Sequence, residues 1–394
     1  MTKKAGGPGE VFRAFLWLGC TCFGGPIAHF GYFQKEFVTR RKWIEEEGYA
    51  DLVALCQFLP GPASSQVGLA LGWKRAGWKG ALAAWVGFTL PSVVLMVAFA
   101  YGVRAAGDLA HFGLVQGLKI AAAAVVAQAV ATMARKLCPD PTRAAVAITV
   151  AVVLTLFPGS WMQLMAIAAG AAATGLCYRW LADLPIVTAP SPTTRASGFF
   201  FLALFFGLLI ALPWLAQVRP SAPLLMLDSF YRAGALVFGG GHVVLPLLQQ
   251  STVQRGWVGQ DTFLAGYGAA QALPGPLFAF SAYLGTFIAP RGIEGALLAL
   301  GAIYLPAVLI LFGALPQWER LRGLQQARVL LAGANAAVVG LLAAAFYSPI
   351  LITTITSPKR FALALCAYGA LQLWRTPPWI VVAACAGVGA IWFG

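Results

Sequence analysis

Two short stretches of this chain of 394 residues place proline and glycine where they would break a helix. QFLPGP at residues 57–62 recurs as QALPGP at residues 271–276, and both lie inside long apolar runs. A proline in a helix interior costs about 3 kcal/mol, because it removes a backbone hydrogen bond and clashes with the preceding turn. A break that occurs twice in the same pattern therefore indicates a function, since it leaves backbone N–H and C=O groups without helical partners.

Breaks of this kind can bind an anion. Irregular backbone at membrane depth must be buried in protein or line a wet cavity, and the N-terminus of a half-helix attracts negative charge. Hydroxyl and amide side chains beside the breaks add neutral hydrogen-bond donors. The alternative is that the prolines only kink the helices. The predicted substrate-binding residues of this region are Gln57, Pro60, Gly61, Pro62, Ser64, Ser65, Gln271, Pro274, Gly275 and Pro276, with Gln66 and Ser281 following the breaks in the sequence.

A second glycine motif also occurs twice, as FGG at residues 23–25 and 238–240. Glycine permits a left-handed turn or the close approach of another backbone. These positions are therefore predicted to form part of the substrate site, with tight helix packing through small residues as the alternative. The residues concerned are Phe23, Gly24, Gly25, Phe238, Gly239 and Gly240.

A few ionisable or amide side chains lie within apolar segments, where such groups are rare and mark functional sites. Arg232 and Lys119 are predicted charge partners of an anionic substrate, although Lys119 could instead extend to the membrane surface. Asn335 is predicted either to donate a hydrogen bond in the site or to join two helices. Three further titratable groups are candidates for ion coupling, with a purely structural role as the alternative for the histidines: His29, His242 and Glu36.

A dense charged segment follows the first glycine motif. It is a solvated segment at the membrane surface or, alternatively, a funnel that concentrates anions at a cytoplasmic mouth. Its charged residues are Lys35, Glu36, Arg40, Arg41, Lys42, Glu45, Glu46 and Glu47.

The composition is that of an integral membrane protein. Hydrophobic residues make up 60% of the chain and charged residues only 10%, whereas soluble globular proteins carry about 25% charged residues. The predicted fold is therefore an all-α polytopic membrane protein with broken or re-entrant helices at the PGP motifs. The net charge of +14 is concentrated in short loops, as the positive-inside bias predicts, so nucleic-acid binding is not expected.

No motif indicates a nucleotide, a cofactor, a metal ion or an enzymatic reaction. The chain lacks a P-loop, a GxGxxG fingerprint and an HExxH motif, and its seven cysteines are scattered. It has 13 acidic residues, mostly in loops. Coupling to an ion gradient is then the simplest energy source for transport.

The predicted membrane segments include two, 49–72 and 262–289, that contain the PGP breaks. The full series is 11–33, 49–72, 79–103, 112–134, 143–157, 160–181, 197–218, 224–249, 262–289, 295–315, 326–347, 359–374 and 377–393.

The recurring motifs belong to one internal repeat. Trp43 matches Trp257 and Leu90-Pro91 matches Leu305-Pro306, and the separation along the chain is the same to within a single position. The predicted domains are an N-terminal transporter repeat (1–181), a linker with an extra membrane helix (182–223) and a C-terminal transporter repeat (224–394). In the first repeat, basic residues gather in the loops around the PGP segment. In the second repeat, they gather instead in a later loop. The repeats are therefore predicted to have opposite topology, as in many secondary transporters.

Together these motifs resemble the signature of the chromate ion transporter family. Gly24-Gly25, twelve residues, Val38, four residues, Trp43, sixteen residues and a PGP follow in that order. The second repeat has the same series, with three residues instead of four before Trp257. The resemblance covers nearly the whole chain, in the long two-domain form.

The resemblance implies a multi-pass protein of the bacterial inner membrane that exports chromate and confers chromate resistance. Such a secondary active transporter would work by alternating access between its two repeats. Chromate is a tetrahedral dianion similar to sulfate, so transport of another oxyanion such as sulfate is the first alternative. A membrane-embedded enzyme or a scaffold is the second. The expected partners are chromate, with sulfate as a competitor, and the lipid bilayer, and a homodimer is left open.

Overall fold

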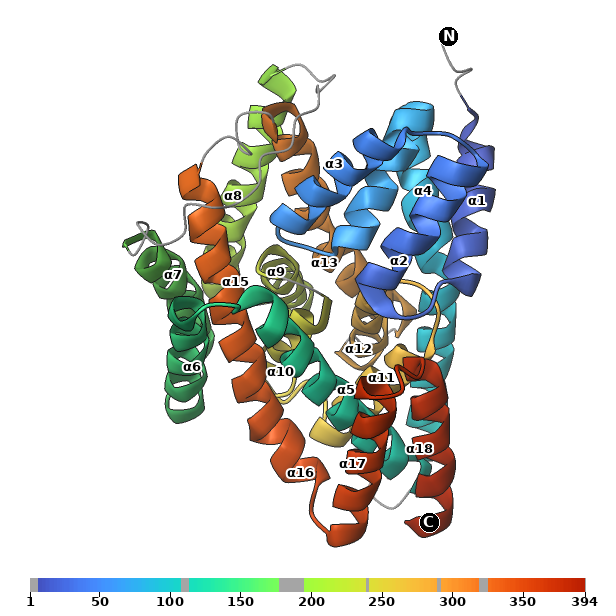
Figure 1. The fold of residues 1–394 in the computed structure, drawn as a ribbon, viewed down its shortest axis with the longest axis vertical. Helices are drawn as coiled ribbons and strands as arrows, with labels where there is room; N and C mark the ends of the chain where they lie inside the picture. Colours follow the sequence, from blue (N-terminus) through green and yellow to red (C-terminus); the bar gives the residue numbers. More distant parts are fainter. Residues whose placement is uncertain are drawn as a thin grey trace. The chain divides into compact units, whose positions relative to one another are not determined.

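The computed structural model describes residues 6–107, 113–176, 195–238, 241–288, 292–318 and 325–393. Every regular element in these ranges is a helix (Figure 1), which confirms the predicted all-α fold. The chain divides into two compact units, and each unit combines segments of both repeats. Unit 1 comprises Met1–Gly102, Thr188–Gly241 and Leu273–Glu319, and unit 2 comprises Val103–Val187, His242–Ala272 and Arg320–Gly394.

Unit 1 takes the first helices of the N-terminal repeat and the PGP-containing part of the C-terminal repeat. Its elements from the first repeat are α1 (Pro8–Thr21), α2 (Gly25–Phe33), the π-helix η1 (Gln34–Arg40), α3 (Glu46–Phe58) and most of α4 (Ala63–Ala106). Its other elements are α8 (Arg195–Val218), α9 (Ala222–Ala235), η4 (Leu277–Ala279), α12 (Phe280–Ile288), α13 (Ile293–Ala314) and η5 (Leu315–Gln317).

Unit 2 takes the remaining helices of both repeats. From the first repeat it contains α5 (Gly113–Leu137), α6 (Pro141–Leu156) and α7 (Ser160–Leu176). From the second repeat it contains η3 (Gly241–Val243) and α10 (Val244–Thr252), α11 (Gln260–Ala272), α15 (Gln325–Ala345), η6 (Phe346–Leu351), α16 (Ile352–Thr354), α17 (Pro358–Gln372) and α18 (Pro378–Trp392).

The predicted PGP breaks are confirmed as interruptions between helices. The first separates α3 from α4, and the second separates α11 from η4 and α12. Two further predicted segments, 11–33 and 224–249, are also interrupted, and the first contains the left-handed turn that its glycine motif permits. The first is split between α1 and α2, where Gly24 has a φ of 101°. The turn needs this left-handed backbone, which glycine adopts without strain.

The long helix α4 is bent in its first third. Ala76 and Gly77 have non-helical backbone angles, and Gly77 has a φ of 60°. Gly292, the counterpart of Gly77 in the second repeat, has a φ of 48° and separates α12 from α13. The two halves of α4 therefore correspond to α12 and α13, and the repeat is visible in the backbone.

Within unit 2, each repeat packs its long helix against the helical pair of the other repeat. The helix α5 lies against α17 and α18, and α15 lies against α6 and α7 (Figure 1). Glycines allow these helices to approach closely. A Cβ atom on Gly117 would lie 2.0 Å from the carbonyl oxygen of Cys385, and one on Gly333 would lie 2.3 Å from that of Gly170. Unit 2 is thus interlocked rather than split into two halves.

Within unit 1, equivalent glycines make the same close contact in each repeat. A Cβ atom on Gly19 in α1 would lie 2.7 Å from the carbonyl oxygen of Phe88 in α4. One on Gly234 in α9 would lie 2.1 Å from that of Ile303 in α13. Both residues of the second pair are the repeat equivalents of those of the first. The first helix of each repeat is therefore held to the proline-containing helix by the same packing.

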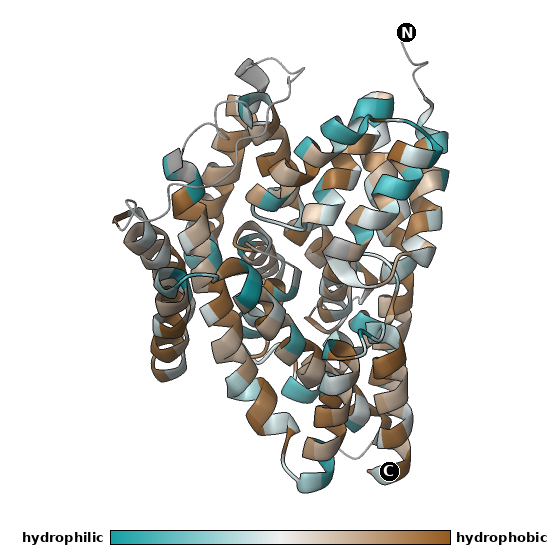
Figure 2. Ribbon diagram, viewed as in Figure 1, coloured by the Kyte–Doolittle hydropathy of each residue, from teal (hydrophilic) through white to brown (hydrophobic). Residues whose placement is uncertain are grey.

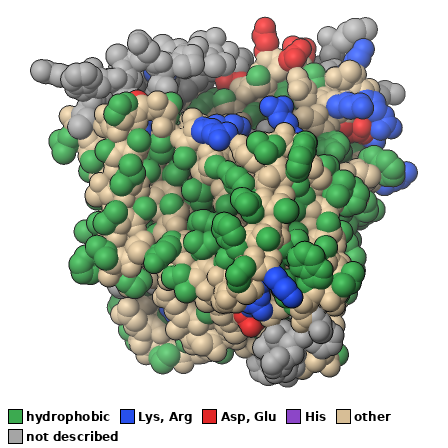
Figure 3. Space-filling model, turned by 60° about the horizontal axis from the view of Figure 1, so that its bottom comes forward, with side chains coloured by type: hydrophobic (Ala, Val, Ile, Leu, Met, Phe, Trp, Pro, Cys, Tyr) green, Lys and Arg blue, Asp and Glu red, His purple; other side chains and the backbone are tan. Residues whose placement is uncertain are grey.

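The helices have the length and surface of membrane spans. Five helices in the described ranges are long and apolar enough to cross a bilayer, and shorter apolar helices accompany them. Many residues along the helices are hydrophobic, whereas hydrophilic residues in unit 1 gather at the end formed by η1 and the start of α3 (Figure 2). On the face drawn in Figure 3, most charged side chains lie near one edge and hydrophobic side chains occupy the middle.

Replacing Gly234 with alanine should destabilise the protein, because the added Cβ has no room beside the carbonyl oxygen of Ile303. Overpacking of this kind typically costs about 1–3 kcal/mol. Gly301 in α13 is the matched control, since a Cβ there meets nothing within 4 Å and alanine is the better helix former. Thermal unfolding of the purified protein in detergent should show a lower midpoint for G234A and an unchanged or higher one for G301A. Equal midpoints for both variants would contradict the packing.

Candidate functional site

Both PGP loops turn sharply at their central glycine. Gly61 has a φ of 116° and Gly275 has a φ of 93°, and a side chain at either position would be strained. Each loop then leads into a helical segment, α4 after the first and η4 with α12 after the second. The two loops lie in the same unit, although they belong to different repeats and are far apart in the sequence.

Each PGP loop is hydrogen-bonded to the glycine motif of the other repeat. The N–H of Gly61 donates to the carbonyl oxygen of Val237 at 2.7 Å, and the N–H of Gly275 donates to that of Cys22 at 2.8 Å. Val237 and Cys22 directly precede Phe238 and Phe23. The two predicted motifs are therefore brought together crosswise, so that the PGP of one repeat meets the FGG region of the other.

Each central glycine also packs against the proline-containing helix of the other repeat. A Cβ atom on Gly61 would lie 3.0 Å from the Cβ of Ala307 in α13, and one on Gly275 would lie 3.0 Å from the Oγ of Ser92 in α4. Ala307 and Ser92 are repeat equivalents, since each follows its Leu-Pro pair. The loops leave no space for larger residues at these two positions.

Gln66 fastens the first loop to the second repeat. Its Nε2 donates to the carbonyl oxygen of Pro60 at 2.9 Å and to that of Ala307 at 3.3 Å. Gln66 lies in the first turn of α4 and is fully buried. Its Oε1 is also buried, with no hydrogen-bond partner among the described residues.

A group of buried hydroxyls surrounds the first turn of α4. The hydroxyl of Tyr304 in α13 interacts with those of Ser65 and Thr89 in α4. None of the three oxygens reaches full hydrogen-bond geometry with any described residue. The Tyr304 ring is held between Trp85, with ring centroids 5.5 Å apart, and Phe278, at 5.7 Å. Buried polar groups normally have partners, so this cluster has unused capacity for hydrogen bonds.

His29 contacts the same turn of α4. Its Nδ1 lies 3.2 Å from the Oγ of Ser64, and its ring meets Phe88 edge to face at 5.2 Å. Its Nε2 is buried without a partner in the described part of the chain. The site candidates Ser64, Ser65 and His29 thus lie close together, and we call these residues with Gln66, Thr89 and Tyr304 the α4 polar cluster.

The sequence pattern did not single out Thr89 and Tyr304. They occupy equivalent positions of the two repeats, each directly before a Leu-Pro pair. The matched Leu-Pro pairs were the available signal. A polar residue before a proline in two equivalent apolar helices would have pointed to both residues.

The arginine predicted as a charge partner is already paired within its own helix. Arg232 donates from Nη2 to Asp228 one turn earlier in α9, and this carboxylate is buried. The Nε of Arg232 is buried with no partner among the described residues. Arg232 thus lies in unit 1, as the α4 polar cluster does, but its charge is largely compensated.

Lys119 belongs to unit 2, where it is also paired. Its Nζ donates to Asp261 Oδ1 at 2.5 Å, which joins α5 to the first turn of α11. The Lys119 side chain is only 4% exposed, whereas that of Asp261 is 39% exposed. That Lys119 contacts the substrate remains a prediction. The structure shows that its ammonium group forms an ion pair with Asp261.

The remaining candidates fall into three groups. His242, Gln271 and Asn335 lie in unit 2, where His242 Nδ1 is 2.8 Å from the Tyr267 hydroxyl. Gln57 lies in α3 and its side chain is exposed. Gly239 and Gly240 lie outside the described residues.

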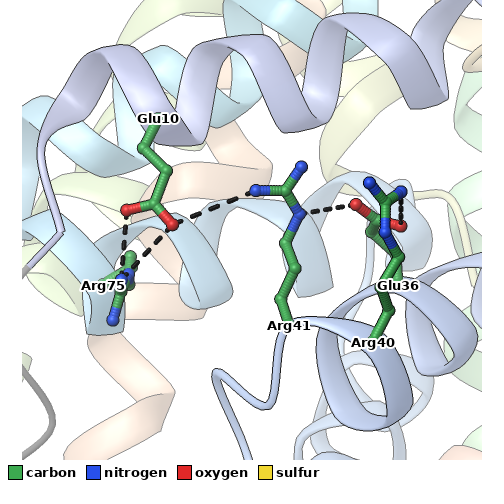
Figure 4. Close-up of polar contacts among 5 residues, drawn as sticks. All are labelled: Glu10, Glu36, Arg40, Arg41 and Arg75. Carbon is green, nitrogen blue, oxygen red and sulfur yellow. Dashed lines mark hydrogen bonds and ion pairs between the residues drawn. The ribbon is translucent and has the colours of Figure 1, made fainter.

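The charged segment forms a chain of ion pairs at one end of unit 1. Glu36 accepts from Arg40 at 2.9 Å and from Arg41 at 2.5 Å, and Glu10 in α1 lies 3.1 Å from Arg75 and 3.9 Å from Arg41 (Figure 4). Their carboxylates compensate these arginines. Glu36 therefore stabilises this end of the unit and lies outside the α4 polar cluster.

A tryptophan is clamped within this chain of ion pairs. The Trp43 ring has the guanidinium carbons of Arg41 and Arg75 at 5.5 and 5.3 Å from its centroid, as in cation–π contacts. In the second repeat, Arg255 lies 5.3 Å from the ring of Trp257. The Arg-x-Trp contact is thus another feature that both repeats share.

The α4 polar cluster has the chemistry of a neutral anion site. Its members are hydroxyls, an amide and an imidazole around the N-terminus of a helix, where free N–H groups favour negative charge. Among the described residues, no three His, Cys, Asp or Glu side chains gather as metal ligands. The groups could hold an oxyanion through hydrogen bonds alone.

Comparison with known proteins gives one consistent result. The sequence model of the chromate transporter family matches residues 9–176 and again 224–390. The chain is 28% identical over 346 residues to the chromate transport protein of Pseudomonas aeruginosa, covering 85% of this chain and 79% of that protein. It is 26% identical over 347 residues to the chromate transport protein of Cupriavidus metallidurans, covering 85% and 81%.

A probable chromate transport protein of Synechococcus elongatus is 28% identical over 347 residues, covering 85% of this chain and 83% of that protein. No solved structure matches. The family model matches the two repeats separately and together covers most of the sequence. The chain therefore belongs to the chromate transporter family, as a multi-pass membrane protein with two copies of the family's domain.

Proposed function

We propose that this protein exports chromate across the bacterial inner membrane as a secondary active transporter, and so confers chromate resistance. Its family membership supports chromate as the substrate. The observation that carries the proposed site is the crosswise pairing of the PGP and FGG regions, which holds a buried, incompletely bonded polar cluster beside a helix N-terminus.

In this proposal the α4 polar cluster binds the oxyanion. The free N–H groups of the first turn of α4 and the hydroxyls of Ser65, Thr89 and Tyr304 donate to the oxygens of the substrate. Each such hydrogen bond to a charged group contributes roughly 1.5–3 kcal/mol. Because no described cation lies among these residues, binding stays weak enough for the ion to be released again, as a transporter requires.

The mechanism we propose is alternating access. The crosswise hydrogen bonds and Gln66 tie the first repeat to the second within unit 1, so the repeats themselves cannot move apart without breaking them. Each unit contains helices of both repeats. Alternating access would then have to leave the paired segments of unit 1 together, and the predicted opposite topology of the repeats would supply two related end states.

The charge of the substrate supports export as the direction of transport. A cell interior is negative, so export of a dianion is electrically downhill by about 2.3 kcal/mol per charge per 100 mV. The deciding experiment is uptake of radiolabelled chromate into inverted membrane vesicles, with and without excess sulfate. Accumulation that depends on the membrane potential and resists sulfate supports chromate export. Accumulation abolished by sulfate would favour the alternative, a transporter of oxyanions such as sulfate.

Replacing Gly61 or Gly275 with valine should abolish chromate flux. Both glycines have positive φ and contacts at 3.0 Å that a side chain would disrupt, together with the crosswise hydrogen bonds. Gly301→Val is the control, because a Cβ there meets nothing within 4 Å. Vesicle flux is compared at equal amounts of membrane-inserted protein. Normal flux in both G61V and G275V would rule out the PGP loops as part of the site.

Removing the Tyr304 hydroxyl should weaken transport without harming the fold. Tyr304→Phe keeps the ring contacts with Trp85 and Phe278, and loses one donor to the substrate. Loss of that donor should raise the apparent KM for chromate roughly 10- to 100-fold. The Tm should stay the same or rise, because the hydroxyl lacks a full hydrogen bond in the described structure.

Tyr231→Phe provides the contrasting case for Tyr304. The Tyr231 hydroxyl donates to the carbonyl oxygen of Phe205 at 2.9 Å, so its removal should lower the Tm and leave the KM unchanged. If Y304F instead transports chromate with the KM of the unmodified protein, the hydroxyl cluster does not bind the substrate.

A further inference from the structure

Unit 2 contains a cavity that none of the predicted site residues lines. Its volume is about 320 Å³. It is lined by the α6–α7 turn, by α10 and the turn after it, by the start of α11, and by the end of α15 with η6. None of the described residues that line it is charged. Its lining includes five glutamines: Gln163, Gln249, Gln250, Gln254 and Gln260.

Two of the glutamines, Gln249 and Gln260, are joined by a hydrogen bond. Gln249 and Gln250 are only 5% and 6% exposed. Gln249 Nε2 donates to Gln260 Oε1 at 3.1 Å. This bond uses the acceptor of Gln260, whose Nε2 is buried with no partner in the described part of the chain. A ligand that accepts hydrogen bonds would satisfy this donor, whereas an empty apolar cavity would not.

The first repeat has the equivalent hydrogen bond, but there the acceptor is a charged carboxylate instead of a neutral amide. Gln34 Nε2 donates to Glu46 Oε1, also at 3.1 Å. Gln34 and Glu46 stand at the positions of the first repeat that correspond to Gln249 and Gln260 in the second. The second repeat thus keeps the geometry and replaces the carboxylate with an amide. The carboxylate would repel an anion, and the amide does not.

We propose that this glutamine cavity binds a hydrated tetrahedral oxyanion. Each primary amide brings two N–H donors and no negative charge. A water molecule takes roughly 30 Å³ of liquid volume, so the cavity holds an oxyanion together with several waters. The ion keeps part of its hydration and the amides replace the rest, which limits the cost of binding a charge where no described lining residue is a cation.

This site is separate from the α4 polar cluster, which lies in unit 1. The identity of the ion as chromate rests on the proposed function. A neutral, hydrated site binds the ion weakly, which is suited to holding an ion briefly during its passage through a transporter.

The test counts chromate ions bound to the purified protein by equilibrium dialysis with radiolabelled chromate. The unmodified protein should bind two ions per chain. Gln260→Glu introduces the residue of the first repeat and keeps an acceptor for Gln249, but places a negative charge in the cavity. It should weaken one of the two sites at least roughly tenfold, and Gln249→Leu, which removes a donor, should weaken the same site.

Controls separate charge, fold and the other site. Gln217→Glu adds the same charge at an exposed position of α8 and should leave both ions bound. Each variant is first checked for a single symmetric peak in size-exclusion chromatography. Gly61→Val should remove the ion of the α4 polar cluster and leave the ion of the glutamine cavity.

Three results would overturn one proposal or both. A single ion, lost in G61V and unaffected by Q260E and Q249L, removes the glutamine cavity and leaves the proposed function. An ion lost in Q260E while G61V binds as before supports the cavity and removes the α4 polar cluster as a site. Absence of any bound chromate contradicts both.

Discussion

The crosswise hydrogen bonds between the PGP glycines and the carbonyls before the FGG motifs are the constraint on which unit 1 depends. Each proline removes a backbone donor and each glycine adopts a left-handed φ, so the loops cannot continue either neighbouring helix. In a membrane the freed backbone groups need partners inside the protein. For the N–H of each central glycine, the partner is the carbonyl oxygen that precedes the FGG motif of the other repeat. Within unit 1, segments of the two copies therefore fold together, and the proposed site lies where they meet.

This near-symmetric backbone carries an asymmetric set of side chains. Ser64, Ser65 and Gln66 follow the first PGP, whereas Phe278, Ala279 and Phe280 stand after the second. The polar groups therefore gather beside one loop, with Tyr304 as the contribution from the other repeat. The same asymmetry recurs in the pair Glu46 and Gln260, where one geometry carries different charges. The two repeats share the backbone arrangement, and the residues that differ between them determine where polar and charged side chains lie.

Periodic apolar runs and repeated motifs were enough to predict the all-α class, the positions of the PGP breaks and the repeat itself. At the FGG motifs the sequence left two readings open, a left-handed turn or tight packing in a continuous helix, because a glycine in an apolar run is compatible with both. The pairing of the breaks could not be predicted, since it joins residues of different repeats that are far apart in the sequence and depends on how the helices of the two repeats interleave. Lys119 and Arg232 could be recognised as unusual, but their carboxylate partners depend on helix contacts and on side-chain direction.

The pairing of the charges bears on how an anion could cross this protein. Arg40, Arg41 and Arg75 contact Glu36 and Glu10, Arg232 contacts Asp228, and Lys119 contacts Asp261. A dianion held by a buried, uncompensated cation would be bound too tightly to leave quickly, because charge interactions strengthen in a medium of low dielectric constant. Hydroxyls, amides and helix N–H groups bind more weakly and can exchange with water. A transporter that must release its substrate on the far side is better served by such neutral donors, with the cations kept to stabilise the ends of the helices.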